Sequence, residues 1–152
     1  VVYNIDSYII ARGNLGVKGL SWDKFQDTVA DCLIRHKSIL DVLTKFQETT
    51  ARVNRAVSKS VTNCGCIQIN AKKQQVPSEI RLYELVSYMD THTKGELCDN
   101  CREIIELEIG NHLFYLAALC NILELNLEDI LCAENEKLST LGIYNLSEFI
   151  IN

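Results

Sequence analysis

The sequence predicts an all-α fold, a bundle of antiparallel helices with one long interruption between two major helices. Two observations indicate this fold. Apolar side chains recur at alternating spacings of four and three residues within segments 38–61 and 98–123, the period of a helix that buries one stripe. The only proline, Pro77, lies in the polar stretch between these segments. With 152 residues, the chain has the length of one domain with its own core, so we expect residues 1–152 to form a single domain.

Three glycines interrupt residues 1–19, which we expect to form an arm or a short strand. Ser21 is a typical N-cap and predicts a helix over residues 22–35. A second helix is predicted over residues 38–61. Its apolar seam is expected to comprise Ile39, Leu43, Phe46, Thr50 through its methyl group, Val53 and Val57. Charged residues lie beside this seam, and Glu48 precedes Arg52 by one turn, the favourable order for an ion pair on a helix surface.

An insertion is predicted over residues 62–97, because glycine, proline and many polar residues replace the helical pattern there. It is expected to contain an extended piece over residues 67–70 and a short helix that Ser78 caps and Gly95 ends. The third long helix should begin between Cys98 and Arg102 and run to Leu123. Its seam is expected to comprise Ile105, Ile109, His112, Leu116, Leu119 and Leu123. Additional apolar residues widen this surface, which predicts a central helix or a helix in an oligomer core.

Asn126 and Asp129 resemble a capping box and predict a last helix that extends through Leu138. The apolar tail that follows is expected to pack on the body of the protein or on a second subunit. The net charge of −5 and the absence of a basic stripe argue against nucleic-acid binding. No apolar run approaches the roughly 20 residues of a membrane span, and the first residues do not resemble a signal peptide. A cytoplasmic location is therefore expected.

The sharpest chemical signal is a set of four closely spaced cysteines that flank the insertion. Cys64 and Cys66 are separated by one residue, and Cys98 and Cys101 by two. Paired cysteines on a glycine-containing turn and at a helix start can place four thiolates around one tetrahedral zinc ion, a closed and therefore structural site. The start of a helix also favours thiolate over thiol.

The same cysteines are compatible with an iron–sulfur cluster, a disulfide or redox pair, or thiols without a ligand. His92 lies nearby in the sequence and is a candidate to replace one thiolate. The chain has seven cysteines, an odd number that does not suit a disulfide framework. The remaining three, Cys32, Cys120 and Cys132, lie among apolar residues at helical positions and are expected in the core.

The stretch "EIGNHLFYLAALCNILELNLEDILCAENEKL" resembles the MazG-like, all-α nucleoside triphosphate pyrophosphohydrolase superfamily, and "FQETTARVNRAV" resembles the preceding helix of that family. The resemblance covers about a third of the chain. It implies a helical fold that assembles as a dimer or tetramer. It also implies a site in which acidic residues of two helices gather Mg²⁺ around a nucleotide triphosphate.

Carried onto this sequence, the resemblance places Glu48, Thr49 and Arg52 on the first helix and Glu108 and Asn111 on the second. Glu48, Glu108 and Asn111 would be the catalytic, metal-binding positions, and Arg52 and Arg55 would contact a nucleotide. Only the two glutamates keep the carboxylate, and a positive charge at a cation site opposes Mg²⁺ binding. The resemblance therefore implies a degenerate site. In an alternative arrangement, Arg52 contacts phosphate and further acids complete the metal site, from Glu96, Glu103 or Glu106.

His112 is either a general base near this site or a packing residue that forms a hydrogen bond, and no nucleophile is recognisable beside it. The first functional hypothesis is a nucleotide-binding or regulatory module that is stabilised by a Cys₄ metal site. The second is an active, magnesium-dependent pyrophosphohydrolase that converts a nucleoside triphosphate to its monophosphate. The third is a redox or metal sensor based on the cysteines.

Overall fold

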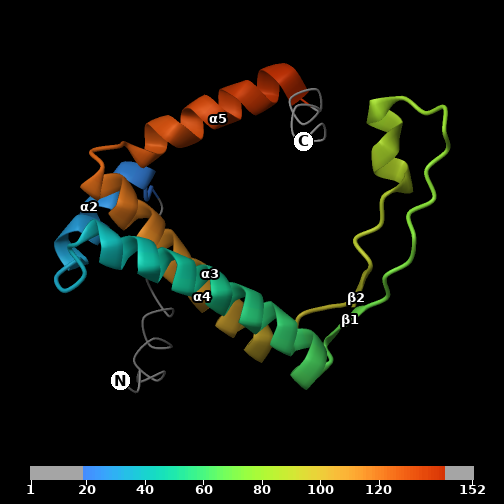
Figure 1. The fold of residues 1–152 in the computed structure, drawn as a ribbon, viewed down its shortest axis with the longest axis horizontal. Helices are drawn as coiled ribbons and strands as arrows, with labels where there is room; N and C mark the ends of the chain where they lie inside the picture. Colours follow the sequence, from blue (N-terminus) through green and yellow to red (C-terminus); the bar gives the residue numbers. More distant parts are fainter. Residues whose placement is uncertain (1–18, 143–152) are drawn as a thin grey trace.

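The computed structural model describes residues 19–142, and this part of the chain is mostly helical (Figure 1). In chain order its elements are α2 (Trp22–Cys32), α3 (Ile39–Lys59), a π-helical turn η1 (Ser60–Cys64), β1 (Ile67–Ile69), a 3-10 helix η2 (Leu82–Tyr88), β2 (Thr93–Gly95), α4 (Asp99–Ile122) and α5 (Leu127–Leu141). The predicted predominance of helix is confirmed, with one two-stranded sheet as the exception. The predictions for residues 1–18 and for the apolar tail after Gly142 lie outside the described residues.

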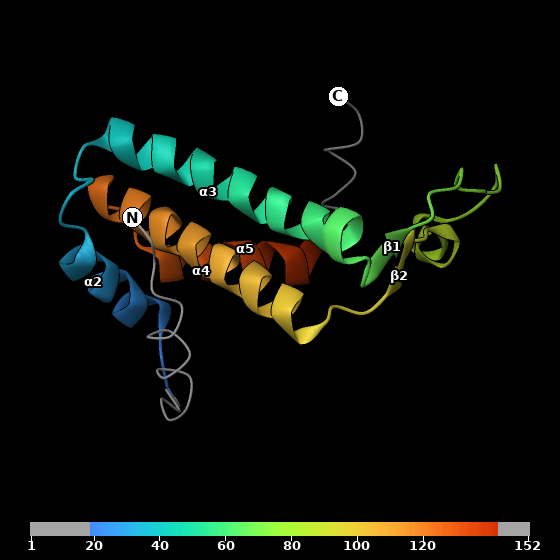
Figure 2. The same cartoon turned by 90° about the horizontal axis from the view of Figure 1, so that it is seen from below.

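Helices α3 and α4 lie side by side and antiparallel, and they form the long axis of the molecule (Figures 1 and 2). Apart from Lys45, the side chains that α3 buries or half-buries are spaced by four and three residues: Val42, Phe46, Thr49, Val53, Ala56 and, in η1, Ser60. This stripe adjoins the predicted one and shares only Phe46 and Val53 with it. The predicted seam positions Leu43, Thr50 and Val57 are exposed, so the predicted seam is wrong by a fraction of a turn.

Helix α2 packs against α4 near the C-terminal end of α4, and a shared apolar cluster holds them together. The fully or nearly buried members of this cluster are Val29, Leu33, Val42, Ala117, Ala118, Cys120 and Leu127. The Oγ of Ser21 accepts a hydrogen bond from the Lys24 N–H, which confirms the predicted N-cap. Helix α2 ends at Cys32, three residues before the predicted end, because Leu33 leaves the helix and enters the apolar cluster.

The side chain of Gln26 fastens α2 to the turn between α4 and α5. Its Nε2 donates to the carbonyl of Leu125 at 2.7 Å, and its Oε1 accepts from the N–H of Leu127 at 2.8 Å. The Asn121 side chain returns a hydrogen bond to the Gln26 carbonyl at 3.0 Å. The two bonds of the Gln26 side chain satisfy backbone groups of the turn and of the first residue of α5 that the helix ends would otherwise leave without partners.

Helix α5 begins as predicted and then leaves the body of the molecule (Figure 1). The Asn126 side chain accepts from the Asp129 N–H at 2.8 Å, which confirms the predicted cap. Only Leu127 of this helix is buried, and the helix continues with four exposed large apolar side chains: Ile130, Leu131, Leu138 and Leu141. In α4 the seam prediction is confirmed at Ile105, which is buried, and wrong at Ile109 and Leu123, which are exposed.

The insertion projects from the end of the α3–α4 hairpin as an arm (Figures 1 and 2). Strands β1 and β2 pair antiparallel at its base, with Ile67 opposite Gly95 and Ile69 opposite Thr93. The predicted extended piece is therefore confirmed. The roles predicted for Ser78 and Gly95 are wrong: η2 begins after Arg81, whose N–H donates to the Glu84 carboxylate, and Gly95 lies in β2. None of the helices within residues 19–142 combines the length and apolar composition needed to cross a membrane.

Candidate metal centre

The four predicted cysteines come together where the arm joins the helical hairpin. Cys64 is the last residue of η1 and Cys66 immediately precedes β1, whereas Cys98 is the N-cap of α4 and Cys101 lies in its first turn. Their four Sγ atoms all lie within 4.8 Å of one another. Within residues 19–142 they are the one group of three or more histidine, cysteine or acidic side chains placed closely enough to share a metal ion.

The spacing of the sulfur atoms suits a tetrahedral metal–thiolate site. Zinc–sulfur bonds of about 2.3 Å at tetrahedral angles place neighbouring sulfurs about 3.8 Å apart. The Sγ atoms of Cys64 and Cys98 are 3.7 Å apart. Four sulfurs at this separation can therefore hold one metal ion with small adjustments of the side chains.

Two glycines with positive φ shape the backbone around the cysteines. Gly65 has φ of 76°, and its N–H donates to the carbonyl of Ser60 at 3.0 Å, so the chain reverses between Cys64 and Cys66. Gly95, with φ of 83°, faces Ile67 across the sheet, and a Cβ there would overlap the carbonyl oxygen of Cys66. Both positions require glycine because the left-handed conformation disfavours other residues.

The helix start and the neighbouring thiols set the protonation of the cluster. The backbone N–H of Cys101, followed by the thiols of Cys101 and Cys64, lowers the pKa of Cys98 to about 7. Burial, followed by the thiols of Cys98, Cys64 and Cys66, raises the pKa of Cys101 to about 12. The hydrogen bond with Cys98 raises the pKa of Cys64. Cys98 is thus the thiolate available near neutral pH, and a bound cation would favour loss of the other protons.

The other histidine and cysteine candidates lie apart from this cluster. The Nε2 of His92 is 2.9 Å from the Nε2 of Gln74, and His92 does not belong to the group of candidate ligands. Cys120 is buried as predicted, but the core prediction is wrong for Cys32 and Cys132, which are exposed. All seven cysteines lie within the described residues, and all of them are free thiols.

The predicted catalytic acids lie on α3 and α4, and Arg52 stands beside both of them. Its Nε and Nη2 donate to the two carboxylate oxygens of Glu108 at 2.8 and 3.0 Å, and its Nη1 lies 3.8 Å from Glu48. The Glu108 side chain is only 12% exposed, so the carboxylate end of this two-bond ion pair is largely shielded from water, whereas the Arg52 side chain is 44% exposed. Glu48 also binds Lys45 at 2.7 Å, and this contact lowers the pKa of Glu48.

The remaining residues that sequence analysis assigned to a nucleotide site are distributed over the same two helices. Asn111 is half-buried on α4, almost one turn after Glu108, and Arg55 is exposed on α3. The three acids of the alternative arrangement, Glu96, Glu103 and Glu106, are exposed.

His112 lies between α3 and α4. Its Nδ1 is 3.2 Å from the Oγ of Thr49, and its ring stacks on Phe46 with centroids 4.4 Å apart. This environment agrees with the packing role that was one of the two predictions for His112. Thr49 itself is buried, which places it in the helix interface rather than in solvent.

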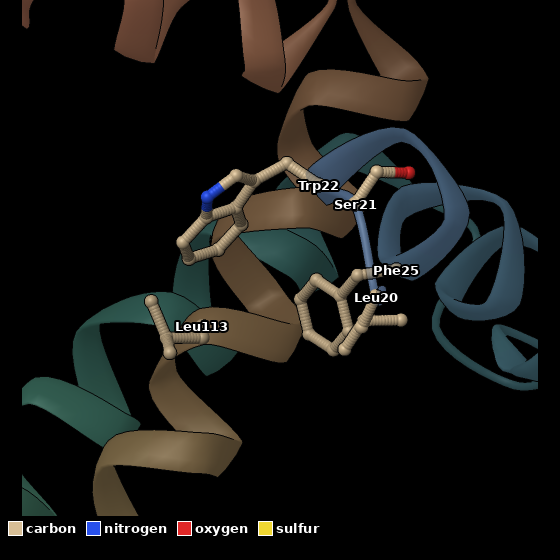
Figure 3. Close-up of a pocket in the computed structure, with 5 residues that line it drawn as sticks. All are labelled: Leu20, Ser21, Trp22, Phe25 and Leu113. Atoms are coloured by element: carbon tan, nitrogen blue, oxygen red, sulfur yellow. The ribbon is translucent and has the colours of Figure 1, made fainter. Parts of the chain in front are cut away.

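A shallow hollow of about 310 Å³ lies on the α2 side of α4 (Figure 3). Its lining comes from the start of α2 and the middle of α4: Leu20, Ser21, Trp22, Phe25 and Leu113. The sequence does not predict this hollow, because the two segments that line it are far apart in the chain. The lining carries no acid, histidine or cysteine, so it offers no group for acid–base or metal chemistry.

Comparisons with protein-family models, with curated proteins and with solved structures find no match for this chain. Functional inference therefore rests on the cysteine cluster and on the ion pairs between α3 and α4.

Proposed function

We propose that this chain is a regulatory or nucleotide-binding module of MazG-like type that lacks pyrophosphohydrolase activity and is stabilised by a structural Cys₄ zinc site. The ion pair between Arg52 and Glu108 is the observation that supports the proposed lack of pyrophosphohydrolase activity. Both carboxylate oxygens of Glu108 already accept hydrogen bonds from the guanidinium group of Arg52. Mg²⁺ would have to displace this guanidinium group to bind the carboxylate.

Zinc is the metal that the cysteine cluster suits best. Four thiolates in a tetrahedron are a common ligand set for structural zinc, and no position is left for a water molecule that could react. The cysteines come from both sides of the insertion, so a bound ion would join η1 to the first turn of α4 and hold the arm at its base. An iron–sulfur cluster uses the same ligands and is the alternative to be tested.

Elemental analysis tests the metal. Protein purified under reducing conditions without chelators should contain one zinc ion per chain and no iron. A Cys98→Ser variant should lose the zinc, whereas a Cys132→Ser variant should keep it because Cys132 is exposed on α5 and outside the cluster. Absence of zinc from the unmodified protein would refute the proposed site, and iron with sulfide would replace it by an iron–sulfur centre.

A panel of nucleoside triphosphates with Mg²⁺ or Mn²⁺ tests the missing activity. We expect no release of pyrophosphate, together with nucleotide binding that Arg55→Gln weakens. An active enzyme remains the second candidate, because Glu48 and Glu108 approach the same guanidinium group and could enclose a metal ion if Arg52 turned toward phosphate. Pyrophosphate release that is abolished by Glu48→Gln and by Glu108→Gln would establish that candidate.

We also propose that the module associates with copies of itself, as the resemblance implies. The exposed apolar side chains of α5 and the exposed positions Leu40, Leu43 and Val57 of α3 support this proposal. Apolar surface on several neighbouring turns is typical of helices that pack against a partner.

A further inference from the structure

We propose that Cys64 and Cys98 form a modification site for hydroperoxides, at which oxidation joins the two sulfurs in a disulfide and releases the metal. This inference rests on the proposed zinc site for the starting state. The pair is defined by geometry: the two Sγ atoms are 3.7 Å apart, and they belong to η1 and to the start of α4. A disulfide requires a separation of about 2.05 Å, which both side chains can approach by small rotations.

Exposure identifies Cys64 as the thiol of the cluster that first meets an oxidant, and the short distance to Cys98 identifies its partner. Cys64 is exposed and can meet a peroxide in solution, whereas Cys101 is buried, with 7% of its surface accessible. Cys66 is half-buried, and its Sγ lies 3.6 Å from the Ser60 carbonyl, within hydrogen-bonding distance. Cys98 is also half-buried, but its Sγ, at the N-cap of α4, lies 3.7 Å from that of Cys64. Cys32 and Cys132 are also exposed, but they lie on other helices, outside the cluster.

The chemistry takes place in two steps. In the zinc-bound starting state the metal would hold Cys64 as a thiolate. This thiolate attacks one oxygen of hydrogen peroxide, the O–O bond breaks, and the leaving hydroxide takes a proton to become water. The Cys98 thiolate then attacks the sulfenic sulfur of Cys64, an S–S bond forms, and a second hydroxide leaves and becomes water. Two thiolates thus supply the two electrons that reduce the peroxide. The metal loses two of its four ligands and departs, and Cys66 and Cys101 take up protons.

The disulfide would keep the base of the arm joined after the metal has left. A Cys64–Cys98 disulfide would link the end of η1 to the N-cap of α4, which are the two segments that the metal joins. It would close the loop that contains the whole arm, and such cross-links restrict the unfolded chain. The oxidised protein should therefore keep its helix content, while the coordination that fixes Cys66 and Cys101 is lost.

Peptide mapping of the zinc-loaded protein tests the inference. After treatment with one equivalent of hydrogen peroxide and alkylation of the remaining thiols, trypsin should release peptide 60–72 linked to peptide 95–102. Fragment ions should place the link between Cys64 and Cys98, and one zinc ion should be released for each disulfide formed. Peptides that stay separate, a link through Cys66 or Cys101, or zinc release without a link would overturn the proposal.

Two matched variants each remove one thiolate from the cluster. Cys66→Ser retains both sulfurs of the pair and should still give the linked peptides, whereas Cys64→Ser should not. The zinc content measured before oxidation allows the proposed zinc site and the proposed Cys64–Cys98 disulfide to be tested independently. A chain without zinc that still forms the Cys64–Cys98 link on treatment with peroxide would refute the zinc site and keep the thiol pair. A chain with zinc that forms no such link would keep the zinc site and refute the pair.

Discussion

At Gly95 the base of the arm leaves no room for a side chain. The residue has φ of 83°, and a Cβ would overlap the carbonyl oxygen of Cys66, which is itself one of the candidate ligands. Backbone atoms on both sides restrict relief of this overlap, since Gly95 pairs with Ile67 in the sheet. The cysteine geometry therefore depends on a residue that contributes no ligand.

Replacing Gly95 with alanine should weaken zinc binding. A left-handed alanine costs about 1–2 kcal/mol, and displacement of Cys66 adds to that cost, so we expect zinc affinity to fall at least about tenfold. Competition with a coloured chelator measures this change. Gly110→Ala is the matched control, because Gly110 is helical with open space around it, and this change should leave zinc binding unaltered while stabilising α4 by up to about 1 kcal/mol. Equal zinc affinity in both variants would contradict the expectation.

The Arg52–Glu108 ion pair should be worth more than a surface pair. Glu108 accepts two hydrogen bonds and is largely shielded, whereas Lys45 and Glu48 pair through one bond at a more exposed position. Double-mutant cycles with alanine at both residues, followed by urea unfolding, should give a coupling free energy of about 1–3 kcal/mol for Arg52 with Glu108 and below about 1 kcal/mol for Lys45 with Glu48. Coupling of equal size would show that Glu108 is effectively solvated.

At the scale of the helices, the type of element could be predicted from sequence more readily than the face that an element buries. Caps such as Ser21 and Asn126 act locally, so their positions follow from residue type and are confirmed. The seam of α3 depends on where α4 lies. Stripes through Val42 and through Leu43 both obey the spacing of four and three residues, and only packing distinguishes them.

The register of α3 can be tested with two neighbouring substitutions. Val42 is fully buried, whereas Leu43 is 44% exposed. Val42→Ala should lower the free energy of unfolding by about 1–3 kcal/mol, because it removes buried methyl groups and leaves a cavity. Leu43→Ala should cost well under half as much in dilute solution, where self-association is minimal. A larger decrease in the free energy of unfolding for Leu43→Ala than for Val42→Ala would show that α3 buries the seam predicted from the sequence. Urea unfolding followed by circular dichroism gives both values.

The candidate metal site could be predicted as a set of four ligands, because cysteine spacing reports directly on coordination. The surroundings of the site could not be predicted. The need for glycine at position 95, where a Cβ would overlap the Cys66 carbonyl, depends on how β1 and β2 pair. The hydrogen bonds between Arg52 and Glu108 could not be predicted either. The family resemblance implied that both residues belong to one site, but it did not indicate that they bind each other. Contacts between segments that are distant in the chain can be predicted only when the tertiary arrangement is known, and a single sequence does not give that arrangement.

At the scale of the whole molecule, α5 presents apolar side chains beyond its first turn. Leu127 is buried against the body, and Leu131, Leu138 and Leu141 continue the same stripe along the helix into exposed positions. A helix of this kind gains most of its stability from packing rather than from intrinsic propensity. This exposed stripe is the surface through which the proposed self-association would take place.

Sedimentation equilibrium should therefore give a mass of two or four times 17.2 kDa. Leu138→Glu places a charge on the apolar stripe and should shift the equilibrium toward monomer, because burying an unpaired carboxylate in an apolar interface is costly. Thr140→Glu adds the same charge about half a turn away on the helix and should leave the mass unchanged, which excludes a general effect of charge. Circular dichroism should show similar helix content in both variants at high concentration. A monomer at every concentration, or equal dissociation of the two variants, would contradict association through α5 and leave its apolar stripe to a different partner.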